Sequence, residues 1–205
     1  MTTLSAALWS APARAESAPA EPLRFDLAAL HEGDPRETER VLRELLPRCR
    51  RWLSRLLGPR ADLDDATQDA LIAIADALRR FEGRSKLTTF AHRITVRTAY
   101  KYFRKRSREE ALTLVPPPPD EIDPESKAMQ REALRRLYRT LERIPKKRRV
   151  AFVLCCIEGM SPMDAAELEG ISSGAMRTRL SHARAEVARR LDADPYISQL
   201  LGGRA

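Results

Sequence analysis

Apolar residues recur along most of the chain at steps of three and four, the spacing of amphipathic helices. Between residues 25 and 57 these positions are Leu27, Leu30, Val41, Leu42, Leu45, Leu46, Trp52, Leu53, Leu56 and Leu57. Gly58 and Pro59 end this run. No segment alternates apolar and polar residues with a period of two, so we predict no β-sheet and an all-α fold.

A second apolar stripe begins after Asp62. It consists of Leu63, Ala66, Ala70, Leu71, Ile74, Ala77, Leu78 and Phe81, and Gly83 breaks it. Asp62, Asp64 and Asp65 occupy the first turn, where carboxylates suit the positive end of a helix. Thr88 or Thr89 is then expected to cap a third helix, which runs from about Phe90 to Arg106.

Four consecutive prolines at 116–119, flanked by acidic residues, predict an extended linker between two small helical domains. The segment 1–22, rich in Ala, Pro and Ser, is expected to be disordered. We therefore divide the chain into an N-terminal tail at 1–22, a first domain at 23–110, a linker at 111–129, a second domain at 130–193 and a C-terminal tail at 194–205.

The second domain begins with a helical stripe of Leu134, Leu137, Tyr138, Leu141 and Ile144, which Pro145 interrupts. Val150, Val153, Leu154 and Ile157 predict another short helix, closed by Gly159.

Residues 162–184 have the layout of a helix-turn-helix. Ser161 is the expected N-cap of the first helix, with Pro162 in the first helical position and Asp164 in the capping-box position. Gly170 suits the tight turn because it can adopt a left-handed conformation, and Ala166 is small where the two helices cross. The second helix has apolar positions at Met176, Leu180, Ala183, Val187 and Leu191.

The polar positions of that second helix favour contacts with DNA. A recognition helix offers its first turns to base edges in the major groove, where Arg pairs with guanine and Ser or Thr serves bases or phosphates. The candidate residues are Ser173, Arg177, Thr178, Arg179 and His182, and Ser181 and Arg184 also occupy polar positions. A structural helix with a solvated basic face is the alternative.

Overall charge also favours a polyanionic partner. The chain has 37 Lys and Arg residues against 29 Asp and Glu, a formal charge of +8. The third helix of the first domain has a basic run made up of Arg93, Arg97, Lys101, Arg104, Lys105, Arg106 and Arg108. Phe90, Tyr100, Tyr102 and Phe103 are interleaved with it, a mixture that suits DNA being opened. In the alternative, Phe90, Ile94 and Phe103 are core and the arginines face water.

Asp62, Asp64, Asp65 and Asp69 form a negative patch in an otherwise positive domain. They either provide favourable N-terminal charge or form a docking surface for a basic protein partner. Metal-dependent phosphodiester chemistry ranks last, because no histidine ligand accompanies them. The spacing of Cys49, Cys155 and Cys156 indicates neither a zinc site nor a disulfide, so we expect no metal or cofactor and a reducing compartment. Cys155 and Cys156 are expected to be ordinary buried residues.

In this order, the motifs resemble the extracytoplasmic-function (ECF) sigma factors of the sigma-70 family. Residues 62–71, DLDDATQDAL, resemble region 2.2 of that family, and 81–94, FEGRSKLTTFAHRI, resemble regions 2.3 and 2.4. Residues 159–184, from the GMSP motif to the end of MRTRLSHAR, resemble region 4.2. The resemblance covers about 25–110 and 130–192.

The resemblance implies an alternative sigma factor that binds core RNA polymerase and directs promoter recognition. Asp62, Asp64, Asp65, Gln68 and Asp69 would dock on the clamp helices of the β′ subunit. Lys86, Phe90, Arg93, Arg97 and Lys101 would bind the minus-10 element, and Ser173, Arg177, Thr178, Arg179 and His182 the minus-35 element. The second domain would also bind the β flap, the linker would thread through the polymerase, and an anti-sigma factor would hold many members inactive.

These expectations describe a cytoplasmic protein with no catalytic residues and no membrane insertion, since no apolar run approaches the roughly 20 residues of a membrane span. One alternative is a free-standing helix-turn-helix regulator that binds a palindromic operator without polymerase. Another is an enzyme that acts on nucleic acid through the aspartates and a metal.

Overall fold

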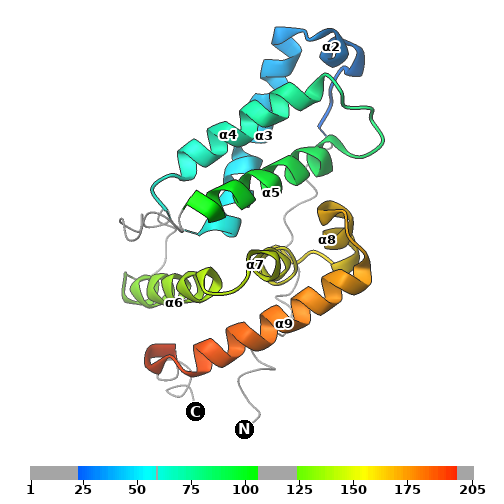
Figure 1. The fold of residues 1–205 in the computed structure, drawn as a ribbon. Coiled ribbons are helices and arrows are strands. Elements are labelled where there is room, and N and C mark those ends of the chain that lie inside the picture. The colour runs from blue at the N-terminus through cyan, green and yellow to red at the C-terminus, as the bar shows by residue number, and fades with distance from the viewer. Residues whose placement is uncertain (1–22, 59, 106–123, 198–205) are drawn as a thin grey trace. The chain divides into compact units, whose positions relative to one another are not determined.

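The computed structural model describes residues 23–58, 60–105 and 124–197, which form helices joined by short turns (Figure 1). Within these ranges no residue belongs to a β-strand, which confirms the predicted all-α fold class. The described residues divide into two compact units, a first at 23–105 and a second at 124–197. The predicted tail 1–22 and the proline run 116–119 lie outside the described residues.

The first unit begins with α2 (Leu27–Glu32) and α3 (Pro35–Leu57). The Asp26 carboxylate caps α2 by accepting from the backbone N–H groups of Ala28 and Ala29. Asp34 caps α3 in the same way, and proline in the first position adds no unsatisfied donor. Gly58 ends α3, as the sequence predicts.

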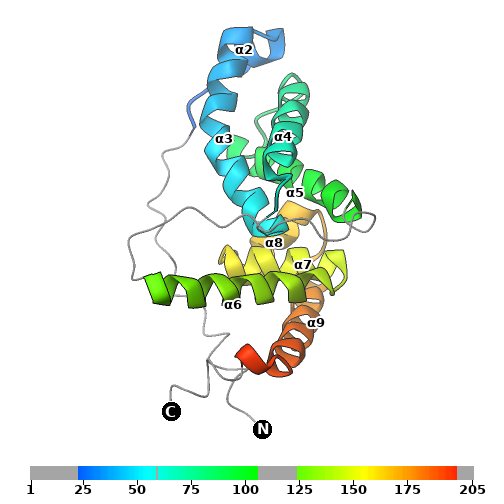
Figure 2. The same ribbon diagram turned by 90° about the vertical axis from the view of Figure 1, so that its left-hand side faces the viewer.

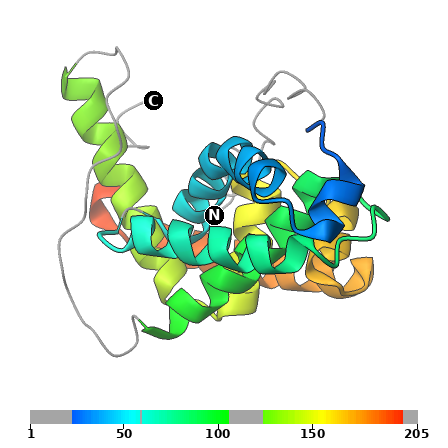
Figure 3. The ribbon, with the colours of Figure 1, turned by 90° about the horizontal axis from the view of Figure 1, so that it is seen from above.

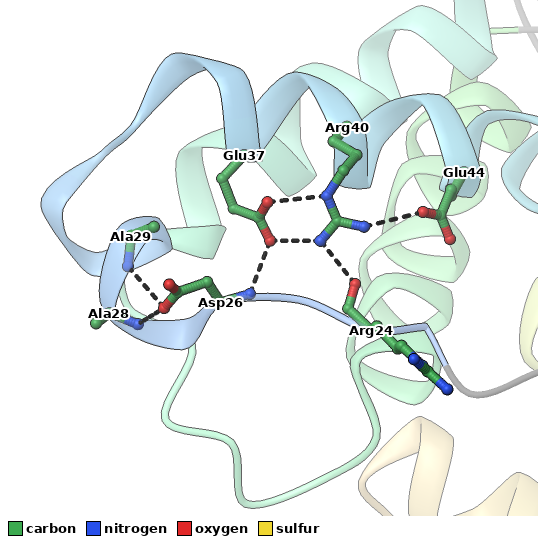
Figure 4. A network of polar contacts seen from close by, with 7 residues as sticks. All are labelled: Arg24, Asp26, Ala28, Ala29, Glu37, Arg40 and Glu44. Atoms are coloured by element: carbon green, nitrogen blue, oxygen red, sulfur yellow. Dashed lines mark hydrogen bonds and ion pairs between the residues drawn. The ribbon is translucent and has the colours of Figure 1, made fainter.

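A polar network ties the segment before α2 to the first turns of α3 (Figure 4). The Arg40 guanidinium donates to Glu37 at 2.6 Å and 2.9 Å and to the carbonyl oxygen of Arg24 at 2.8 Å. Glu37 also accepts from the backbone N–H of Asp26 at 2.7 Å. These hydrogen bonds, that from Arg40 first, hold the pKa of Glu37 below its ordinary value.

The acidic and basic helices of the first unit are α4 (Leu63–Leu78) and α5 (Leu87–Lys105). The expectation that Thr88 or Thr89 caps α5 is wrong. The Lys86 carbonyl accepts from the Phe90 N–H at 3.1 Å, so the helix already includes both threonines. The predicted end at Arg106 lies outside the described residues.

The helices α3, α4 and α5 contact one another pairwise and form the body of the first unit (Figure 2, Figure 3). Fully buried side chains from these helices include Leu45, Cys49, Ile74 and Ala91. The Cys49 thiol accepts from the Thr95 hydroxyl at 3.6 Å, and burial raises its pKa.

The second unit contains α6 (Pro124–Glu142), α7 (Lys146–Phe152), α8 (Pro162–Glu169) and α9 (Ser173–Asp192). The helix α6 begins inside the segment 111–129 that the sequence analysis assigned to the linker, with Pro124 as its first residue. Proline is favourable there because the first helical N–H has no acceptor within the helix. Helix α9 contacts α6, α7 and α8.

Residues Val153–Ile157 form a π-helical turn, η1, rather than the plain continuation of an α-helix that the periodicity predicts. The N–H of Glu158 donates to the Val153 carbonyl at 2.9 Å, five residues back. The wider turn leaves Cys155 and Cys156 half-buried, so the expectation that both are buried is wrong. Both thiols are free, and the Cys156 sulfur accepts from the Arg184 guanidinium at 3.4 Å.

The first residues of the predicted C-terminal tail, 194–197, pack on the second unit. The Asp194 carboxylate accepts from Arg136 at 2.7 Å and from the backbone N–H of Tyr196 at 3.0 Å. The Arg136 guanidinium lies 4.4 Å from the centre of the Tyr196 ring, and Ile197 is buried. The tail 194–205 is therefore anchored at its beginning.

Candidate nucleic-acid interface

The turn between α8 and α9 has the predicted chemistry. The Ser161 hydroxyl accepts from the Asp164 N–H at 3.1 Å and caps α8. Gly170 has a left-handed backbone conformation, with φ 66° and ψ 39°, and its N–H donates to backbone carbonyls near the end of α8. The Ile171 N–H donates to the Ala166 carbonyl at 3.0 Å, which closes the turn. Ser172 then caps α9 through the Ala175 N–H at 3.2 Å.

Buried contacts fix the crossing of the two helices. Met176 and Ala183 are fully buried, and Ala166 and Leu180 are nearly so. Ile171, expected to fill the angle between the helices, is half-buried. The predicted apolar stripe of α9 is therefore its core face, and the polar positions are left for the surface.

Three of the five predicted minus-35 residues lie exposed on α9, namely Arg177, Thr178 and His182. Ser181 is exposed beside them, and Ser173 is half-buried at the start of the helix. The Thr178 hydroxyl donates to the Gly174 carbonyl at 3.1 Å, which leaves its oxygen able to accept. This face offers donors of the kinds that read base edges or hold phosphates.

Arg179 differs from the other predicted contacts. Its guanidinium lies 3.6 Å from the Glu169 carboxylate at the end of α8, and the two side chains are 22% and 10% exposed. The Arg179 guanidinium is thus partly engaged within the protein, in an ion pair that connects α9 to α8. Arg184, another polar position of the sequence pattern, is half-buried against Cys156.

The basic helix α5 exposes some of its predicted contact residues. Arg97 and Lys101 are exposed on the helix, and Lys86 is exposed just before it. Arg93 is half-buried. Phe90 is half-buried and its ring centre lies 4.8 Å from that of Phe81, so it packs on the core.

Two other aromatic side chains of α5, Tyr102 and Phe103, are buried and cannot serve as platforms for bases in this conformation. Tyr102 and Phe103 are 6% and 7% exposed, and Tyr100 packs edge-on against Phe103 at 5.8 Å. The Tyr102 hydroxyl donates to Asp69 at 3.0 Å, and burial followed by this carboxylate raises the Tyr102 pKa. The prediction that these aromatics contact opened DNA is therefore wrong for Tyr102 and Phe103.

Helix α5 also contains a buried histidine. The His92 ring stacks on Trp52 with ring centres 4.2 Å apart and planes 9° apart. Burial, and secondly the charge of Arg55, lowers the His92 pKa to about 4. His92 is therefore a neutral core residue near pH 7.

The acidic face of α4 consists of Asp64, Asp65, Gln68 and Asp69, all of which are exposed. Asp64 forms an ion pair with Arg50 at 2.8 Å between two exposed side chains, which is a weak interaction. Asp62 is half-buried and held by the guanidinium of Arg60, a partner that the sequence analysis missed. Asp62 is thus less available to a partner than the other four.

In the part of the chain that the structure describes, no group of three His, Cys, Asp or Glu side chains is placed to hold a metal ion. Nor does any helix there combine the length and the apolar character needed to cross a membrane.

Comparisons with known families account for both units. The family model for sigma-70 region 2 matches residues 41–109, and the model for sigma-70 region 4 matches residues 134–187. The chain belongs to the ECF sigma factors of the sigma-70 family. The first match covers the acidic and basic helices, and the second covers the helix-turn-helix.

Similar curated proteins are the ECF RNA polymerase sigma factor SigM of Mycobacterium tuberculosis and the sigma-E factor of Escherichia coli. The SigM match is 28% identical over 131 residues and spans 63% of this chain and 64% of SigM. The sigma-E match is 28% identical over 144 residues and spans 62% of this chain and 72% of sigma-E.

Two solved structures share the fold. One is CnrH in complex with the cytosolic domain of CnrY, 25% identical with a TM-score of 0.58 over 82% of this chain and 96% of that one. The other is the sigma factor RpoE in complex with the anti-sigma factor NepR from Bartonella quintana, 24% identical with a TM-score of 0.56 over 76% and 97%.

Proposed function

We propose that this ECF sigma factor binds core RNA polymerase and directs it to promoters. The observation that carries this proposal is a pair of surfaces of opposite charge in one chain. Asp64, Asp65 and Asp69 are exposed on α4, while Arg177 is exposed on α9 behind a left-handed turn. A free-standing regulator of the helix-turn-helix type needs the second surface but not the first.

The acidic face of α4 is the proposed docking site for the β′ clamp helices. Carboxylates gathered on one exposed face attract a basic protein surface and would repel DNA. Gln68 lies between Asp65 and Asp69 and adds hydrogen-bonding capacity to the same face. We infer that Asp62 contributes less directly, because Arg60 already holds it.

The two basic surfaces are the proposed promoter contacts. Lys86, Arg97 and Lys101 would hold phosphates of the minus-10 element, with Arg93 and Phe90 contributing from half-buried positions. Arg177, Thr178 and His182 would contact the minus-35 element, together with Ser173 and, after release from Glu169, Arg179. The segment joining the two units, proposed as the linker, would allow both to bind one DNA.

Further parts of the proposal concern partners and location. An anti-sigma factor is a proposed regulator, since both similar solved structures contain a protein bound to the sigma factor. We further propose that the second domain docks on the β flap of the polymerase. The protein would act in the cytoplasm and would have no catalytic residues of its own.

The test is transcription in vitro. The purified chain is added to core polymerase and fragments of the source genome, and the 5′ ends of the RNA are sequenced. We expect co-purification with the polymerase and initiation at defined sites that share two sequence elements. Initiation that does not depend on the added chain, or operator binding by the chain alone, would refute the proposal.

Arg177→Ala tests the minus-35 assignment. Loss of an arginine that pairs with a base should weaken promoter binding by about 1–3 kcal/mol and relax sequence preference at one position. Arg36→Ala, which removes an exposed arginine from the first turn of α3, is the control and should bind as the unaltered chain does. Equal binding by both variants would remove Arg177 from the interface.

A further inference from the structure

Five arginines surround one pocket between α6 and the end of α9, in a place that the sequence analysis did not single out. The pocket has a volume of about 420 Å³. It is lined by Arg136 and Arg139 from α6, by Arg143 in the turn that follows α6, and by Arg189 and Arg190 at the end of α9, with Asp194 as its acidic member. Such a concentration of guanidinium groups favours an anion, because each presents a planar fork of donors.

The five arginines fall into two groups. Arg136 is held by Glu132 and Asp194, and Arg190 forms an ion pair with Glu186 at 3.1 Å. Arg139, Arg143 and Arg189 are exposed, and among the described residues no hydrogen bond or ion pair engages their guanidinium groups. The first group fixes the pocket, and the second group is available to a ligand.

Arg189 also continues the exposed face of the helix-turn-helix. At about 100° per residue, Arg189 lies about 20° around α9 from Thr178 and from His182. All three side chains are exposed, so one face of α9 joins two of the proposed DNA contacts, Thr178 and His182, to the pocket.

The length of α9 determines what this face can meet. Its 20 residues extend about 30 Å, while the major groove is about 12 Å wide and about 8.5 Å deep. A helix of this length that crosses the groove with its first turns against the bases extends past the groove edge, where phosphates lie.

We propose that Arg139, Arg143 and Arg189 bind backbone phosphates of the same DNA that α9 reads. This inference rests on the proposed function and adds a second, sequence-independent contact to it. A DNA phosphate suits these positions better than a small enclosed anion, since the three arginines are exposed and the partial negative charge at the C-terminus of α9 disfavours an anion pressed against the helix end.

Salt dependence tests the proposal. Polymerase containing this chain is titrated with a promoter fragment taken from the mapped start sites, at a series of salt concentrations. The association constant for DNA falls as the salt concentration rises. In the variant R139Q/R143Q/R189Q, the plot of log association constant against log salt concentration should be less steep, by about 0.9 for each phosphate that the arginines no longer neutralise. Preference for the cognate minus-35 element over a scrambled one should stay unchanged. R36Q is the control and should leave the slope unaltered.

Each outcome has one meaning. A slope equal to that of the unaltered chain would overturn the inference and leave the proposed function intact. A change in sequence preference without a change in slope would overturn it too, since it would indicate base contact. Failure of the unaltered holoenzyme to bind the fragment would refute the proposed function and, with it, this inference. Circular dichroism of the variant should match the unaltered chain, because all three substitutions lie on the surface.

Discussion

Gly170→Ala isolates the energetic contribution of the turn between α8 and α9. Gly170 has φ 66°, and no atom lies within 4 Å of the position that an added Cβ would occupy. A steric clash with the rest of the protein therefore adds nothing, and the cost is that of a left-handed backbone at a residue with a side chain. That cost is about 1–2 kcal/mol, or roughly a 5- to 30-fold shift in a local opening equilibrium.

Hydrogen exchange of α9 amides in the full-length chain measures this opening directly. Gly170→Ala should accelerate exchange by that factor, and Gly170→Asn should do so less, because asparagine tolerates the left-handed region. Gly174→Ala is the matched control. Gly174 lies inside α9 without a positive φ, and its added Cβ would lie 4.0 Å from the Ser172 hydroxyl. Alanine there should stabilise the helix by about 0.4–1 kcal/mol and therefore slow the exchange of its amides.

An unchanged exchange rate in Gly170→Ala would refute this reasoning, because the turn would then not require a left-handed residue. A loss of stability well beyond about 2 kcal/mol would also contradict it. Such a loss would require the added methyl group to clash with a neighbour, and no atom lies close enough to Gly170 to do so. Equal effects of the two alanine substitutions would show that exchange reports helix propensity alone.

Two further predictions concern the first unit. Glu37→Gln should lower the melting temperature at neutral pH, because the depressed pKa of Glu37 means that its ionised form stabilises the fold above the ordinary pKa of about 4.3. The difference in melting temperature between the variant and the unaltered chain should disappear as the pH falls through and below that value. A difference that persists at about pH 2 would contradict the assignment. Tyr102→Phe should destabilise the first unit by about 1 kcal/mol in urea unfolding followed by Trp52 fluorescence, since it removes the hydrogen bond to Asp69, and an unchanged midpoint would show that the bond contributes nothing.

Local chemistry explains what the sequence could predict. The Ser161 cap, the left-handed Gly170 and the stripe of Met176, Leu180 and Ala183 depend on neighbours within a few residues. The same is true of the acidic first turn of α4. These features follow from backbone geometry and helical periodicity, which do not need the rest of the fold.

What the sequence could not predict depends on residues far apart or on competing local options. Tyr102 looks like an accessible aromatic in a basic run, but it is buried beside Asp69, 33 residues away. Arg179 looks free, yet Glu169 is within 3.6 Å across the turn. Thr88 and Thr89 are good capping residues, but the helix starts earlier than either.

The arginine pocket shows a related limit. Arg139 near the end of α6 and Arg143 just after that helix are four residues apart in the sequence, a spacing that is typical of a solvated helix face. Only the packing of α6 against the end of α9 brings Arg189 beside them. Charge that is spread along the sequence is thus gathered at one place by the fold.

The central claim is that the chain binds polymerase through the acidic face of α4 and binds DNA through the basic faces of α5 and α9. The most direct measurement compares the affinity of D64N/D65N for core polymerase with that of E32Q/E39Q, which removes two exposed carboxylates elsewhere. We predict that the first variant binds core polymerase at least about tenfold more weakly, a difference of about 1.4 kcal/mol, and that the second binds like the unaltered chain. Equal affinity of both variants, or no binding of the unaltered chain to polymerase, would contradict the account.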